Sequence, residues 1–148
     1  MFSETTKAKI KIEMSHIEHE IGLLQVLGEK NKIEEPDEIE IRSIASILHS
    51  FYNGIENIIK NILLNYGELL PNDLNWHKAL LSLLLKKSEL RTLVISEQLK
   101  SKLDKYMGFR HFFRHAYGFQ FDWEMMKDLV EDVDAVWNDF KSVVSVEM

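Results

Sequence analysis

Apolar residues recur every three or four positions along most of the chain, and charged or polar residues fill the positions between them. This spacing is typical of amphipathic helices. The first such stretch extends from Thr5 to Gly28, with apolar residues at Ile10, Met14, Ile17, Ile21 and Leu24. After a break, Pro36 followed by Asp37 has the order of residues found at a helix start. The second stretch continues to about Asn65, so the pattern predicts two long helices.

Three shorter stretches repeat the pattern. Asp73 or Asn75 can cap a short helix, Ser96 can cap a fourth that runs toward Gly118, and Asp122 can cap a fifth. Only the β-branched run at 143–146 fits a helix poorly. Since no stretch alternates apolar and polar residues as strands do, we expect an all-α fold. The predicted architecture is an antiparallel bundle of four to five helices in a single domain over residues 1–148.

Composition narrows the class of protein. The chain of 148 residues has no cysteine, which excludes disulfides, thiolate nucleophiles and zinc ribbons. No apolar run approaches the ~18 residues of a membrane span, and no leader pattern is present, so we expect a soluble, cytoplasmic protein without membrane contact. The net charge of −6 argues against a surface that coats nucleic acid broadly. A polyanionic partner would need a local basic site.

Such a site is suggested by the uneven distribution of charge. Between Ser96 and Tyr117 five basic residues stand against two acidic ones, whereas segment 118–148 is strongly acidic. At about 100° per residue on a helix, four cationic or titratable side chains fall on one face: Arg110, His111, Arg114 and His115. The aromatic residues of the same segment fall on the opposite, core-facing side. Arg110 and His115 are therefore predicted to point toward a common space.

Two guanidinium groups and two imidazoles suit cleavage of an RNA phosphodiester without a metal. Arginine pairs with phosphate oxygens through a planar fork, and an imidazole can move a proton near neutral pH. Histidine pairs at His111 and His115, or at His16 and His19 with Glu20, could in principle bind a metal. Neither set has the further ligand that would complete a site, so no metal and no cofactor are predicted. The motifs of dinucleotide-binding folds, P-loops and zincins are absent from the sequence.

The residues Arg110-x-x-x-x-His115-x-Tyr117 carry the R-x4-H-x-Y pattern of HepT-type toxins in the HEPN superfamily. The segments around this motif, together with Phe51–Ile58 and Trp76-His77-x-x-Leu80-Leu81, resemble a HepT-like subgroup. The likeness covers about residues 10 to 140. It implies a HEPN-like helical bundle that pairs as a homodimer and brings both motifs to one cleft. It also implies a metal-independent ribonuclease whose partner is a small nucleotidyltransferase antitoxin, which in some systems adds AMP to the motif tyrosine, here Tyr117.

On this resemblance Arg110 and His115 are the predicted catalytic residues. His111 and Arg114 are predicted to contact RNA, although the family usually has a small polar residue at the position of His111. The polar residues Asn53, Glu56 and Asn57 either line the cleft and orient Arg110 or make polar contacts without a role in function.

Other readings of the same residues stay open. His49 and His77 are interpreted as capping or surface residues, and the three tryptophans as core anchors. The alternative function is a non-catalytic helical subunit that binds nucleotide or RNA and partners a small nucleotidyltransferase. The acidic segment 118–148 is either a solvated helix face, a shield over the basic face or a contact for a basic antitoxin surface.

Overall fold

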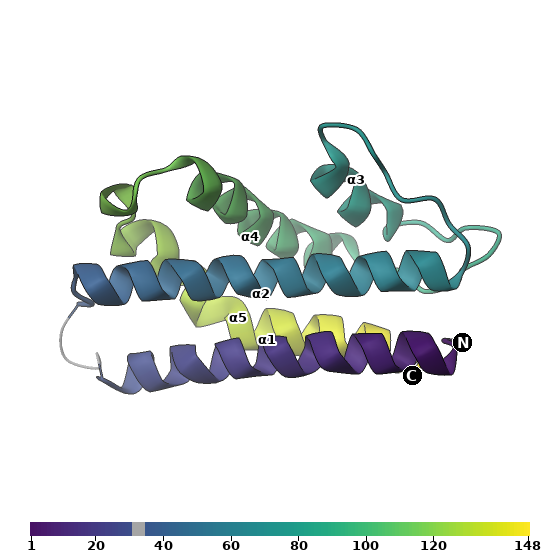
Figure 1. Cartoon of the computed structure of the whole chain (residues 1–148), viewed down its shortest axis with the longest axis horizontal. Helices are drawn as coiled ribbons and strands as arrows, with labels where there is room; N and C mark the ends of the chain where they lie inside the picture. Colours follow the sequence, from purple (N-terminus) through teal and green to yellow (C-terminus); the bar gives the residue numbers. More distant parts are fainter. Residues whose placement is uncertain (31–34) are drawn as a thin grey trace.

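Two long antiparallel helices, α1 (Glu4–Lys30) and α2 (Glu38–Asn65), lie side by side along the whole length of the molecule (Figure 1). This computed structural model describes residues 1–30 and 35–148. The remaining helices are α3 (Trp76–Leu83), α4 (Glu97–His115), the single 3-10 turn η1 (Gly118–Gln120) and α5 (Trp123–Ser145). Within the described ranges all regular secondary structure is helical and no strand is present. The predicted all-α bundle is confirmed.

Helices α2, α4 and α5 begin where the sequence predicted, and the N-cap of α2, which was not predicted from the sequence, is Asp37. The Asp37 carboxylate accepts a hydrogen bond from the Glu40 amide at 2.8 Å, and the Glu40 side chain accepts in return from the Asp37 amide. Ser96 caps α4 and Asp122 caps α5 through their side-chain oxygens, each at 3.0 Å. At α3 the side chain of Asn75 makes no cap bond. The segment that fitted a helix poorly is helical as far as Ser145, because Val144 is fully buried in the core.

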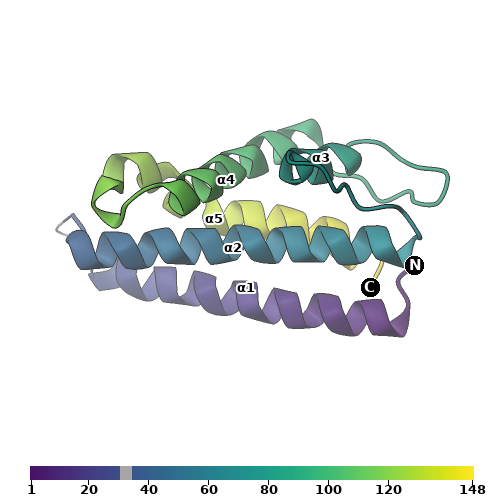
Figure 2. The same cartoon turned by 45° about the horizontal axis from the view of Figure 1, so that its top comes forward.

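Helix α2 is the centre of the bundle and packs against α1, α3, α4 and α5. The close contact between α1 and α2 depends on Gly54, since a Cβ at this position would lie 2.5 Å from Cγ1 of Ile17. Of the three tryptophans, Trp137 is buried as predicted, whereas Trp76 and Trp123 are only partly buried. Both chain ends lie at the same end of the bundle (Figure 2), where the Met1 ammonium is 3.0 Å from the Glu147 carboxylate.

A buried arginine holds α3 in place. The side chain of Arg91, in the loop between α3 and α4, is only 1% exposed. Its guanidinium donates to both carboxylate oxygens of Glu68, at 2.7 and 3.2 Å, and to backbone carbonyls that include Leu83 at the end of α3. The loops that enter and leave α3 are therefore fastened to one another. No helix in the described part of the chain has both the length and the apolar character needed to cross a membrane.

Candidate functional site

Arg110 points into the bundle from α4 and is held there by α2. The Arg110 Nε donates a hydrogen bond to Oδ1 of Asn53 at 2.7 Å and lies 3.6 Å from a carboxylate oxygen of Glu56. The Arg110 side chain is 13% exposed and that of Glu56 only 3%. A planar guanidinium with two fixed partners has little freedom to rotate. Asn53 and Glu56, one helical turn apart on α2, thus fix the direction in which Arg110 presents its remaining N–H groups.

His77 of α3 completes the arrangement around Arg110. Its Nδ1 lies 2.6 Å from the second carboxylate oxygen of Glu56, and its Nε2 lies 3.3 Å from Nη1 of Arg110. Arginine can only donate, so Nε2 accepts and the ring proton sits on Nδ1, from which it is donated to Glu56. The interpretation of His77 as a capping or surface residue is therefore wrong. Three helices meet in one hydrogen-bonded cluster, which we call the arginine cluster: Asn53, Glu56, His77 and Arg110.

His49 extends this cluster along α2. Its Nε2 accepts from the Asn53 side-chain amide at 3.1 Å, and its ring stacks on Phe113 with the centroids 4.4 Å apart. Burial, and then the positive charges of Arg110 and Arg114, lower the pKa of His49. This residue too was expected at a cap or on the surface. Instead it lies between α2 and α4, where it is neutral at pH 7.

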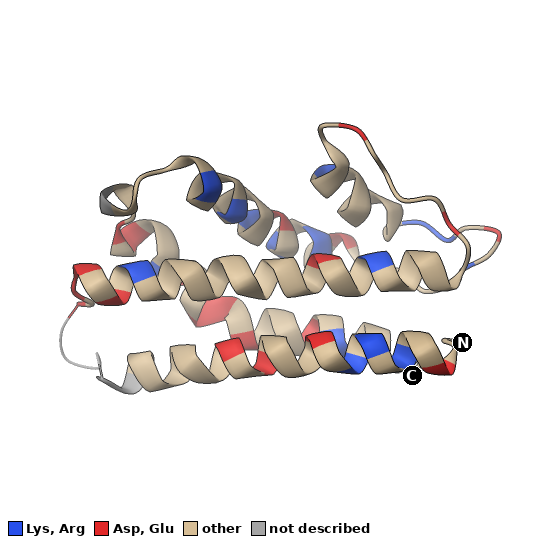
Figure 3. Ribbon diagram, viewed as in Figure 1, with Lys and Arg blue, Asp and Glu red and all other residues tan. Residues whose placement is uncertain are grey.

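The other motif residues of α4 face solvent. His111, Arg114 and His115 are exposed, and the rings of the two histidines are 4.6 Å apart between centroids. Among the described residues Arg114 makes no hydrogen bond or ion pair. Tyr117, just beyond the end of α4, is 73% exposed. Lysine and arginine recur along α4 (Figure 3), so the basic surface follows this helix.

The structure does not bring every predicted site residue together. Within the described chain, Arg110 turns toward α2 and α3 and makes no hydrogen bond with His115, which is solvent-exposed on the same helix. Asn57 makes no hydrogen bond with Arg110 within the described chain; it lines a groove between α1 and α2, beside Glu13 and His16, that Asn53 also borders. In the described ranges no group of three histidine, aspartate or glutamate side chains is arranged to hold a metal ion.

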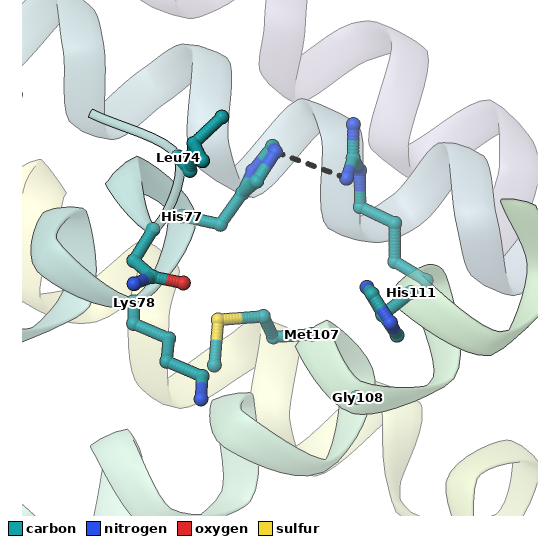
Figure 4. A pocket seen from close by; sticks show the side chains of 8 residues that line it. Leu74, His77, Lys78, Met107, Gly108 and His111 are labelled. Atoms are coloured by element: carbon teal, nitrogen blue, oxygen red, sulfur yellow. Dashed lines mark hydrogen bonds between the residues drawn. The ribbon is translucent and has the colours of Figure 1, made fainter. Parts of the chain in front are cut away.

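A pocket of about 380 Å³ opens beside the arginine cluster, between the start of α3 and the middle of α4. His77 and Lys78 border it from α3, and Met107 and His111 border it from α4 (Figure 4). Arg110 is among the lining residues. Sequence reasoning missed this pocket, because its two walls are about 30 residues apart in the chain and meet only once α3 is in place.

The bundle and the arginine cluster define the class of protein, an all-α protein with one fixed arginine where three helices meet. Comparison with known families gives a more specific result: a family model described as HepT-like protein matches residues 43–146. The chain therefore belongs to the HepT-like family, within the HEPN superfamily. The matched range contains the whole arginine cluster. No curated protein and no solved structure matches the chain.

Proposed function

We propose that this chain is a metal-independent endoribonuclease, the toxin of a toxin–antitoxin pair. The observation that carries the proposal is the fixed guanidinium of Arg110, which Asn53, Glu56 and His77 orient from two other helices. A preoriented cationic fork stabilises the charge that develops on a phosphate during cleavage, and it does so without reorganisation. Membership in the HepT-like family supports the same reading.

In the proposed mechanism a histidine removes the proton from the ribose 2′-hydroxyl. The 2′-oxygen then attacks phosphorus, the bond from phosphorus to the 5′-oxygen breaks, and a second histidine donates a proton to that oxygen. Each proton transfer contributes about 10² to 10⁴ in rate. Arg110 holds the non-bridging phosphate oxygens, and Arg114 and His111 contact the neighbouring backbone.

A single chain does not place His115 against Arg110, and a homodimer removes this difficulty. A two-fold axis near α4 would set the exposed His115 of each copy opposite the Arg110 of the other copy. One His115 could then act as base while its mate acts as acid. This requirement is consistent with the exposure of His111, Arg114 and His115, because residues of a shared cleft must be accessible in the isolated copy.

Tyr117 is the residue at which we propose that the antitoxin modifies and inactivates the ribonuclease. Its 73% exposure at the end of α4 makes it accessible to a modifying enzyme, and AMP attached there would place a phosphate next to the basic face. The proposed antitoxin is a small nucleotidyltransferase. The acidic segment 118–148 offers a surface for a basic region of that partner.

The direct test compares cleavage of a single-stranded RNA by three proteins in the presence of a chelator. We expect the wild type to cleave, His115→Ala to lose at least about 100-fold in rate, and the exposed control His19→Ala on α1 to match the wild type. Circular dichroism should show the same helicity in all three. Undiminished cleavage by His115→Ala would remove the mechanism.

The second candidate is a helical subunit that binds RNA or nucleotide without cutting it. The arrangement within one chain favours it, since the fixed guanidinium of Arg110 makes no hydrogen bond with His115 among the described residues. An RNA affinity that falls with salt and depends on Arg110 and Arg114, without product after long incubation, would support this function over the first.

A further inference from the structure

The pocket between α3 and α4 adjoins the proposed cleavage site and shares Arg110 with the motif, but its other lining residues lie outside the R-x4-H-x-Y pattern. Its volume of about 380 Å³ lies at the lower end of the range for small-molecule sites. His111 lies at its edge, and the His111 ring is 4.6 Å from that of His115 between centroids. An RNA strand with its scissile phosphate near His115 would therefore pass the mouth of this pocket.

The walls of the pocket favour an anion. Arg110, Lys78 and His111 line it, and no carboxylate is among its lining residues. The carboxylate of Glu56, which contacts the lining residues His77 and Arg110, is occupied by these two partners. Lys78 is exposed and makes no ion pair with any described residue. Its ammonium is thus available to a phosphate that enters from solvent.

The remaining wall is suited to a flat ring. Met107 contributes a flexible thioether, a group that packs well against aromatic rings. Gly108 is exposed, and a Cβ built at this position would have no heavy atom within 4 Å. A ring can therefore approach the α4 backbone at Gly108, where any other residue would project a side chain into the opening.

We propose that this pocket binds the RNA nucleotide next to the scissile phosphate, with the far phosphate of that nucleotide on Lys78 and its base against Met107 and Gly108, while Arg110 holds the scissile phosphate. This inference rests on the proposed ribonuclease function and specifies how the substrate is held. The lining residues outside the motif would then set the preference for the base that flanks the cut.

Gly108 allows a sharp test, because the pocket can be filled without disturbing the core. Gly108→Leu adds a side chain in open space and improves helix propensity by up to about 1 kcal/mol. Gly22→Leu on α1 is the matched control, since Gly22 also lies within a helix with nothing close to its Cβ position. A second pair is Lys78→Ala and the exposed control Lys87→Ala.

The probe is a fluorescent eight-nucleotide RNA with 2′-O-methyl groups, which cannot be cleaved through the 2′-hydroxyl. We expect Gly108→Leu to raise its Kd at least 10-fold, and Lys78→Ala to lower the slope of log affinity against log salt by about 0.7. Both controls should match the wild type. Unchanged binding by Gly108→Leu and an unchanged salt slope in Lys78→Ala would overturn the pocket proposal.

Cleavage of the unmodified octamer, measured in parallel, separates the two proposals. If the wild type cleaves the octamer and neither pocket variant changes the KM, the pocket proposal is wrong and the ribonuclease proposal is retained. If the two pocket variants weaken binding of the probe as expected but the wild type does not cleave RNA, the ribonuclease proposal is wrong and the pocket proposal is retained.

Discussion

At the scale of single residues, Glu56 is a buried charge with a partner at each carboxylate oxygen. Its side chain is 3% exposed and its two oxygens serve Arg110 and His77. Glu56→Gln keeps the shape but leaves Arg110 without its counter-charge, so we expect a loss of about 3 kcal/mol in the free energy of unfolding. Urea denaturation measures this loss. Glu18→Gln, which breaks the exposed pair with Lys141, should change stability by less than about 1 kcal/mol, and an equal effect of both would contradict the buried-pair account.

His77 is predicted to act on the rate through Arg110. His77→Ala removes the acceptor for Nη1, and a displaced guanidinium can cost about 100-fold in kcat. In His77→Gln the amide oxygen can accept from Arg110 in place of Nε2, so this variant should recover part of kcat. Steady-state kinetics of the two variants would reveal the difference. Loss of kcat to the same level in both would indicate that His77 has only a structural role.

The lowered pKa of His49 makes stability depend on pH. Since the folded-state pKa lies below the ordinary value of 6.5, the unfolded chain binds the proton first as the pH falls. The contribution of neutral His49 is complete above about pH 6.5 and is lost progressively below it. The free energy of unfolding should therefore decrease more from pH 7.5 to pH 5.5 in the wild type than in His49→Gln. Parallel pH profiles for the two proteins would show that His49 is not the titrating group.

Part of the site could be predicted from the residues and part could not. Arg110 and His115 share a motif, and the helical period places Asn53 and Glu56 on one side of α2. His77 and His49 were misassigned, because neither has a local pattern that reveals its partner. His77 lies 33 positions from Arg110, and their contact depends on how Arg91 fastens the loops around α3. The resemblance around Trp76-His77 was the only signal available.

At the scale of elements, the packing of α1 on α2 requires a residue without a Cβ at position 54. Gly54→Ala would place a methyl group 2.5 Å from Cγ1 of the buried Ile17. We expect the variant to lose about 1–3 kcal/mol in stability despite the better helix propensity of alanine. Gly22→Ala, with open space at its Cβ, should instead be neutral or stabilising. Thermal unfolding of both variants tests this.

A double-mutant cycle identifies the cause of any loss in Gly54→Ala. Ile17→Ala removes the two atoms nearest to the new methyl group, so the double variant should be more stable than the sum of the single effects predicts. Strict additivity would mean that the helices do not meet at this point.

Helix positions were predicted better than helix contacts. Ser96 and Asp122 cap the helices that they were expected to cap, and α2 begins at the predicted Pro36-Asp37 start, because a helix start depends on local hydrogen bonds. Helix α2 is the centre of the bundle because residues on several of its faces are buried. The spacing of apolar residues along the sequence does not by itself predict which helix takes this central position. The placement of α3 depends on contacts between distant loops.

At the scale of the whole molecule, basic residues outnumber acidic ones along α4, whereas segment 118–148 is acidic. The bundle fixes Arg110 from within and leaves His115 to solvent, so the proposed chemistry needs two copies. The net charge of −6 disfavours binding of RNA elsewhere on the surface. We therefore expect RNA to bind along α4 and at the pocket beside it.

The most direct test of the central claim is the chemical identity of the ends left on RNA by the purified wild-type protein in excess chelator. Attack by the 2′-oxygen, assisted by histidine, predicts a 2′,3′-cyclic phosphate on one fragment and a 5′-hydroxyl on the other. Mass spectrometry of the products distinguishes these ends from the alternatives. Fragments that carry a 5′-phosphate and a 3′-hydroxyl, or cleavage that appears only when a divalent metal is added, would contradict the account.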